Sequence, residues 1–250
     1  RAVPWKSARA VFPRPRPRPR RRPAMLAFVW TVFFVLLGWA PFLWWHWEKH
    51  GVVNPTHVVL TMFNAINVLI CFWEHSLWLH RANIKKEYKR LKRRGHDKRL
   101  PTPLCLFQPI TTRQAFSYRY WSVIWSQYAL LDPSYADQTS FGFWIDSGNG
   151  IVTMPVTVLL SFGATFDDGL VGLNLSPKTI AKLGLVCNYQ MLYGTVLYFA
   201  NYLLNEHWRG ASRNSILVVV MANCIWIVFP ALWMRVCWRV VETGDWAGLR

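Results

Sequence analysis

Long runs of apolar residues, separated by short polar segments, dominate the chain. Five of them approach or exceed the ~20 residues that a helix needs to cross a ~30 Å hydrocarbon core. These runs are Met25–Trp47, His57–Leu79, Ser140–Phe162, Ile180–Leu204 and Ser215–Trp238. The pattern predicts an all-α integral membrane protein that forms a bundle of five transmembrane helices.

The first apolar run follows basic residues, as the apolar core of a secretory signal does. It lacks a small-residue cleavage pattern and ends in Trp44, Trp45, His46 and Trp47, which are typical of an interfacial aromatic belt. We therefore interpret this run as a retained span.

The composition supports a membrane protein. Hydrophobic residues make up 53% of the chain and charged residues only 16%, and 16 residues are Trp. An ordinary soluble domain is less apolar than this, so a soluble protein is disfavoured.

The net charge of +17 is concentrated in two segments. Residues 1–23 hold nine and residues 81–100 hold ten of the 29 Lys and Arg residues. With two helices between them, both segments would lie on the same membrane face, which the positive-inside rule makes cytosolic. Asp167 and Asp168 agree with this orientation, whereas Arg235, Arg239 and Arg250 oppose it, so the orientation stays open.

Membrane lipids with anionic headgroups are the expected partners of the basic segments, and no nucleic acid is expected because no nucleic-acid-binding motif accompanies them.

These patterns divide the chain into three parts. Residues 1–24 form a basic, Pro/Arg-rich, disordered tail that could lie outside the functional protein, because Met25 opens the first span. Residues 25–240 form the membrane domain, with a basic loop at residues 80–119, and residues 241–250 form a C-terminal tail. The sequence leaves a monomer and a homodimer open.

Asp146 is the most informative residue, because it lies within the nearly uncharged run 141–166. An ionisable group at bilayer depth costs several kcal/mol, so it usually has a partner or a function. Asn149 and Thr153 share its helical face, since residues three, four and seven apart are neighbours on a helix. Gly148 and Gly150 beside it would allow a second helix or a flat ligand to approach the backbone.

The other spans carry polar and aromatic residues that could line a cavity with Asp146. The alternative is that the Asn and Tyr residues form hydrogen bonds between helices and have only a structural role. These candidates are Asn64, Asn67, Glu74 and His75 in the second run, Asn188, Tyr189, Tyr193 and Tyr198 in the fourth, and Asn223 and Trp226 in the fifth.

A carboxyl group in such a cavity would suit proton transfer, because removal from water favours its protonated form. Aromatic π faces can stabilise a nearby positive centre. Together these groups favour chemistry through a carbocation in a water-poor pocket. The sequence shows no metal-ligand set, no phosphate-binding loop and no paired cysteine spacing, so we expect no metal, no cofactor and no disulfide.

The chain resembles the emopamil-binding protein family, which has the EXPERA fold and includes sterol Δ8–Δ7 isomerase. The resemblance covers roughly residues 120–240 and is carried by three motifs. They are Trp125-x-x-Tyr128-x-x-x-Asp132-x-x-Tyr135 followed by Asp146 and Pro155, then Leu192-Tyr193-Gly194-Thr195-Val196-Leu197-Tyr198-Phe199, and Asn223-x-x-Trp226-x-x-x-Pro230.

The resemblance implies a multi-pass protein of the endoplasmic reticulum membrane whose helices enclose a sterol or another polycyclic lipid substrate. In the isomerase an acidic group protonates the C8–C9 double bond, and loss of the C7 proton from the carbocation shifts the bond. The resemblance implies catalytic roles for Asp146, Glu74, Asn149, Asn223 and Trp226. Residues expected to bind the ligand are His75, Trp125, Tyr128, Thr153, Tyr193 and Tyr198.

The chain also departs from the isomerase pattern. Asp146 is one methylene shorter than the family's Glu, and Ile70 stands where the isomerase has a His four residues before the Glu of its second helix. His75 is adjacent to Glu74 and points about 100° away from it around the helix. Thr195 stands where the family has Asp. These departures leave two alternatives open. One is a non-catalytic sterol- or lipid-binding protein of the same fold that acts in sterol trafficking or regulation, and the other is a structural membrane subunit.

Overall fold

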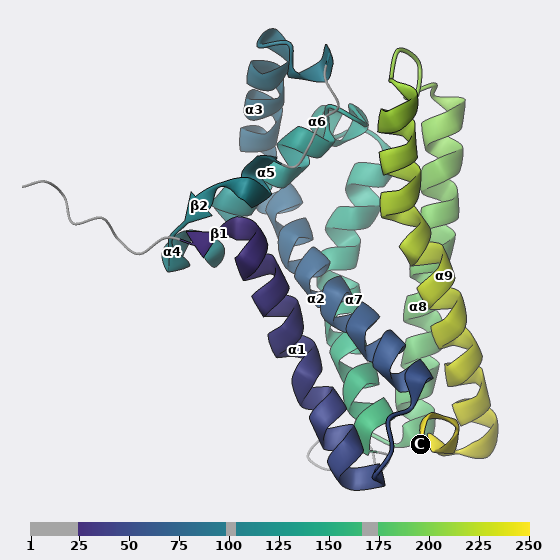
Figure 1. Ribbon diagram of the computed structural model, residues 1–250. Helices are drawn as coiled ribbons and strands as arrows, with labels where there is room; N and C mark the ends of the chain where they lie inside the picture. Colours follow the sequence, from purple (N-terminus) through teal and green to yellow (C-terminus); the bar gives the residue numbers. More distant parts are fainter. Residues whose placement is uncertain (1–24, 99–103, 167–174) are drawn as a thin grey trace, which may run out of the picture.

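The computed structural model describes residues 25–98, 104–166 and 175–250, so the predicted tail at residues 1–24 lies outside the described residues. Five long helices run along the length of the molecule (Figure 1). They are α1 (Ala27–His50), α2 (Pro55–Leu79), α7 (Phe141–Phe166), α8 (Pro177–Leu204) and α9 (Arg213–Thr243).

The structure agrees with a helical, multi-pass membrane protein. Among the described residues, α1, α2, α7 and α9 are long and apolar enough to cross a membrane. The fourth predicted run, residues 180–204, lies within α8, which has 28 residues but is not among these four. Its Lys178 and Lys182 at one end and several Asn, Gln and Tyr side chains lower its apolar character, so a fifth span remains a prediction.

Polar caps and glycines set the ends of the long helices. The side chain of Asn54 accepts hydrogen bonds from the backbone of Thr56 and His57, and Pro55 occupies the first turn of α2. Ser176 and Ser212 cap α8 and α9 in the same way. Gly244 ends α9 with a φ of 91°, a conformation that strains residues with a Cβ.

The segment predicted as a basic loop at residues 80–119 is largely helical. It contains α3 (Arg81–Arg93), in which Ile84 and Leu91 are buried while Lys85, Lys89 and Arg90 are exposed. Apolar residues at this helical spacing let a strongly basic segment pack as an amphipathic helix. The shorter elements that follow are η1 (His96–Lys98), η2 (Leu104–Phe107), β2 (Pro109–Ile110), α4 (Thr112–Ala115), α5 (Tyr118–Tyr128) and α6 (Ser134–Asp137).

Of these elements, α6 lies beside α3 towards one end of the molecule, and β2 and α4 lie beside the start of α1 (Figure 1). The strand β1 (Met25–Leu26) pairs with β2 in an antiparallel arrangement, with Met25 opposite Ile110. The start of α1 is thereby tied to the segment that follows α3.

The C-terminal residues are packed, which corrects the expected tail at residues 241–250. α9 continues to Thr243, and the following Trp246 and Leu249 are 1% and 2% exposed. They join an apolar core that includes Leu160 and Trp233 at the end of the molecule opposite α3. Burial of these two side chains explains why the segment is ordered.

The contact between α2 and α7 is closely packed and uses polar side chains. Asn64 donates hydrogen bonds to the carbonyl oxygen of Thr157 at 3.2 Å and to Oγ of Ser161 at 2.9 Å, and Asn67 donates to Oγ1 of Thr157 at 2.9 Å. These Asn residues therefore link helices, as the structural alternative predicts.

The aromatic end of α1 is only partly an exposed belt. Trp44 and Trp47 are 57% and 53% exposed, as expected for interfacial side chains. His46 is instead buried, and its ring stacks on that of His57 with centroids 3.8 Å apart. The basic end of α1 thus packs against the start of α2.

Candidate functional site

A cavity of about 230 Å³ lies where α2, α5, α6, α7, α8 and α9 converge. The structure brings eight of the eleven predicted site residues to its walls. They are Glu74, Trp125, Tyr128, Asp146, Asn149, Tyr198, Asn223 and Trp226.

Asp146 is placed in this cavity by α7 and held by a residue of α6. The hydroxyl of Tyr135 donates a hydrogen bond to Oδ2 of Asp146. Tyr135 is 2% exposed, and its burial, together with the nearby Asp146 charge, raises the pKa of its hydroxyl well above the usual value. Tyr135 therefore remains a donor at neutral pH and fixes one oxygen of Asp146, while Oδ1 has no hydrogen-bond partner among the described residues.

Glu74 enters the same cavity from α2. It is 5% exposed, and it lies close enough to Asp146 for the two carboxyl groups to interact electrostatically. A Cβ atom added to Gly150 would lie 2.8 Å from Cβ of Glu74, so α7 can pack here only because this residue lacks a side chain. Two carboxyl groups on neighbouring helices thus face one small cavity.

A chain of hydrogen bonds leads from the cavity to a buried carboxylate. The amide of Asn223 donates to the Tyr128 hydroxyl at 2.9 Å, which lies 3.1 Å from the Tyr198 hydroxyl. Tyr198 donates to Oδ2 of Asp132 at 3.0 Å, so Tyr128 must donate to Tyr198. Burial raises the pKa of the Tyr128 hydroxyl, which keeps it protonated. The chain therefore has a defined direction and fixes both tyrosines.

The remaining walls are mostly aromatic. Trp125 stacks on Tyr135 with ring centroids 5.5 Å apart and 9° between the planes, and its Nε1 donates to the Trp73 carbonyl oxygen at 2.8 Å. Nε1 of Trp226 donates to Oδ1 of Asn67 at 3.2 Å. These bonds satisfy both indole N–H groups within the protein and fix ring surfaces that can face a cation.

Asn149 lines the cavity one turn beyond Asp146. Its Oδ1 accepts a hydrogen bond from Nε2 of Gln190 at 2.9 Å, which fixes the side chain from α8. Asp146 and Asn149 thus lie on the face of α7 that lines the cavity.

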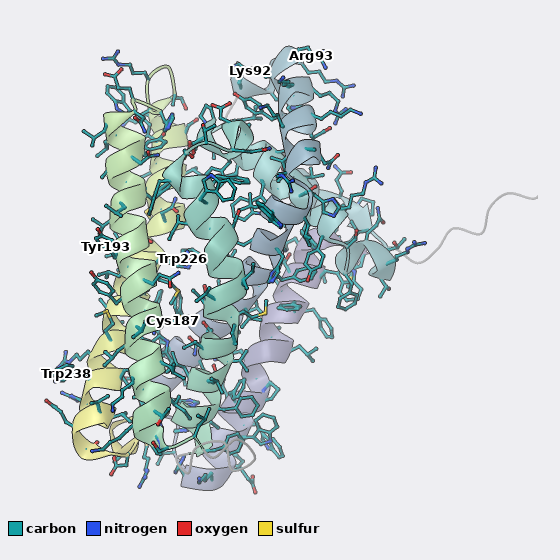
Figure 2. The ribbon with its side chains drawn as sticks, turned by 180° about the vertical axis from the view of Figure 1, so that it is seen from behind. Lys92, Arg93, Cys187, Tyr193, Trp226 and Trp238 are labelled. Atoms are coloured by element: carbon teal, nitrogen blue, oxygen red, sulfur yellow. The ribbon has the colours of Figure 1, made fainter. Side chains whose placement is uncertain are left out.

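Three predicted ligand-binding residues do not line the cavity. His75 faces Tyr118 and hydrogen-bonds to the carbonyl oxygen of Cys71 at 2.6 Å, because adjacent residues on a helix point in different directions. Thr153 is buried against the Cys71 thiol at 3.1 Å, a full turn below the cavity. Tyr193 is 49% exposed on the outer side of α8 (Figure 2).

Sequence reasoning did not select Tyr135 or Asp132 as site residues. Both belong to the first motif of the family resemblance, but only the fold shows that Tyr135 binds Asp146 and that Asp132 anchors Tyr198. It also did not select Ile70, which lines the cavity where the isomerase pattern has a His. At this position the wall of the cavity is therefore apolar.

The site contains no arrangement suited to a metal. Within residues 25–98, 104–166 and 175–250, no group of three or more His, Cys, Asp or Glu side chains could hold a metal ion.

No protein-family model, curated protein or solved structure matches the chain. The class that fold and site define is thus an α-helical membrane protein with a carboxyl-lined, aromatic cavity.

Proposed function

We propose that the protein is a membrane isomerase that shifts a ring double bond of a sterol from Δ8 to Δ7. The observation that carries this proposal is that Asp146 and Glu74 share one cavity with the indole of Trp226. An acid, a base and a cation-stabilising surface are the groups that such an isomerisation needs.

The reaction can be written with these two carboxyl groups alone. Asp146, when protonated, transfers its proton to C9 of the C8–C9 double bond and leaves a cation at C8. The carboxylate of Glu74 removes a proton from C7, and the C7–C8 double bond forms. Because one proton is added and one is lost, no oxidant, reductant or cofactor is required.

The size of the cavity suits the reacting rings rather than a whole sterol. Its volume of about 230 Å³ is just below the ~300–1,000 Å³ usual for small-molecule sites. Among its lining residues, Ala222 is exposed and Ile70 and Ile124 are half-buried, so the cavity is open where α9 faces α2 and α5. The rest of the ligand would extend through this opening.

The direct test is expression of the full chain in cells that lack the Δ8–Δ7 isomerase, followed by sterol profiling. We expect Δ8-sterols to fall and Δ7-sterols to appear. In D₂O, the product should carry deuterium at C9. Continued accumulation of Δ8-sterols with the protein present in the membrane would refute the proposal.

The same cells would show by fractionation whether the protein resides in the endoplasmic reticulum, as we propose.

Variants assign the roles of the two carboxyl groups. Asp146→Asn and Glu74→Gln should each abolish turnover, whereas Asp137→Asn, which removes an exposed carboxylate of α6, should leave it unchanged. Tyr135→Phe keeps the ring but loses the hydrogen bond to Asp146, and it should lower turnover by roughly tenfold to a thousandfold by analogy with other positioned donors.

A second candidate is a sterol- or lipid-binding protein without turnover. The apolar Ile70 in the cavity wall favours it, because it stands where the isomerase resemblance implies a His. Saturable binding of a sterol or a cationic amine by the purified protein, with no deuterium incorporation, would support this function and exclude isomerisation.

A further inference from the structure

A second cavity, of about 560 Å³, lies at the C-terminal end of α9. One wall is apolar and includes Leu232 and Val236 of α9 together with Trp246 and Leu249 of the C-terminal segment. This cavity shares no lining residue with the first one.

Two arginines line this second cavity. Arg235 and Arg239 are one helical turn apart on α9, and both are exposed. Neither guanidinium forms an ion pair with a carboxylate among the residues that the structure describes. Paired guanidinium groups without protein partners favour an anion, above all a phosphate, which accepts several hydrogen bonds from them.

The arginines also lie at the depth of lipid headgroups. Residues 214–234 of α9 are free of charged side chains. At 1.5 Å per residue this run spans about 31 Å, which matches the ~30 Å hydrocarbon core. Arg235 therefore begins the boundary region, where Trp238 is 58% exposed like an interfacial aromatic (Figure 2).

The C-terminal segment keeps the apolar wall in place. Trp246 and Leu249 are buried, and the side chain of Asn54 donates a hydrogen bond to the carbonyl oxygen of Arg250 at 3.1 Å. Asp245 also lines the cavity, but its Oδ1 accepts a hydrogen bond from the Ala247 backbone at 2.9 Å. Its charge is thus partly compensated within the segment.

We infer that this cavity binds one anionic phospholipid, whose phosphate contacts Arg235 and Arg239 and whose acyl chain packs against Leu232 and Val236. An exposed basic patch alone would attract headgroups without holding a chain. The combination of a cavity, an apolar wall and two arginines at headgroup depth favours a single bound lipid. This inference does not depend on the proposed isomerase activity.

Native mass spectrometry of the full chain in detergent tests the inference, with phosphatidylglycerol and phosphatidylcholine of identical acyl chains as probes. We expect phosphatidylglycerol to bind roughly tenfold more tightly, and Arg235→Gln with Arg239→Gln to remove this preference. The matched control is Arg209→Gln with Arg213→Gln, which removes two exposed arginine charges that are also four residues apart but lie at the other end of α9. Equal binding of the two lipids, or unchanged binding by the arginine double variant, would overturn the inference.

Two further measurements separate a lipid site from a general anion site. Leu232→Trp fills the cavity without changing the charge, so it should weaken phosphatidylglycerol binding; unchanged binding would contradict the acyl-chain site. Inorganic phosphate should not displace the lipid at comparable concentration, and displacement would show that a free anion is the ligand. If the arginine double variant elutes as aggregate, Arg239→Gln and Leu232→Trp carry the same test.

Discussion

Replacing Gly150 by Ala tests the contact that places Glu74 in the cavity. The new Cβ would lie 2.8 Å from Cβ of Glu74, 3.1 Å from the carbonyl oxygen of Cys71 and 3.3 Å from the backbone nitrogen of His75. Two of these atoms belong to the α2 backbone and the third is a Cβ, so no flexible side chain can move aside. The helices must separate, and overpacking of this kind costs about 1–3 kcal/mol.

Gly148 supplies the matched control, because a Cβ added there meets no atom within 4 Å. Both substitutions replace Gly by Ala in the interior of α7 and gain the same helix propensity, up to about 1 kcal/mol. This gain cancels when the two variants are compared. Gly150→Ala should therefore be less stable than Gly148→Ala by about 1–3 kcal/mol.

The difference can be measured by SDS titration of the detergent-solubilised protein, with circular dichroism as the readout. Binding of a cationic amine should weaken in parallel in Gly150→Ala, because Glu74 moves with α2. Equal unfolding midpoints for the two variants would refute the close packing of α2 and α7. A loss of stability with unchanged amine binding would instead show that Glu74 does not contact the ligand.

Two further substitutions test the supports of the site and of the C-terminal segment by the same unfolding assay. Tyr198→Phe leaves Oδ2 of Asp132 buried without a donor and should cost about 1–3 kcal/mol, whereas Tyr193→Phe, on the outer side of α8, should have almost no effect. Trp246→Ala empties a fully buried position and should cost about 3–5 kcal/mol, while Trp238→Ala, at a 58% exposed position, should cost less than about 1 kcal/mol. A reversed order within either pair would contradict the packing described here.

The apolar pattern predicts the long helices well, because length and hydrophobicity determine which segments can cross a membrane. The predicted span Ser140–Phe162 begins one residue before α7 and ends four residues before α7 does. The spans His57–Leu79 and Ile180–Leu204 end at the same residues as α2 and α8, and the remaining ends differ by five residues or fewer. The ends differ because capping residues such as Asn54 and Ser212 decide where a helix starts, and hydropathy does not detect them. The basic segment after α2 was wrongly predicted as a loop, since its few apolar residues are outnumbered by charges.

The candidate site could be predicted only as far as helical geometry reaches. Spacing within α7 places Asp146 and Asn149 on one face, and the cavity contains both. Spacing within one helix does not predict where a second helix contacts it. Thr153 lies on the same face of α7 as Asp146, but it packs against Cys71 of α2. The hydrogen bond from Tyr135 to Asp146 depends on how the short helix α6 is placed between α5 and α7, which no periodic pattern specifies.

Asp132 and Asp146 differ in how fully the protein satisfies their carboxyl oxygens. Both oxygens of Asp132 have donors within the protein, the backbone nitrogen of Ser134 at 3.0 Å and the Tyr198 hydroxyl at 3.0 Å. A carboxylate that serves packing is satisfied in this way, because an unpaired buried oxygen is costly. Asp146 is instead only half-buried and lines the cavity, and within the described part of the chain its Oδ2 has a donor while its Oδ1 has none. One carboxyl oxygen of Asp146 is therefore available to a ligand in the cavity, as the proposed proton transfer requires.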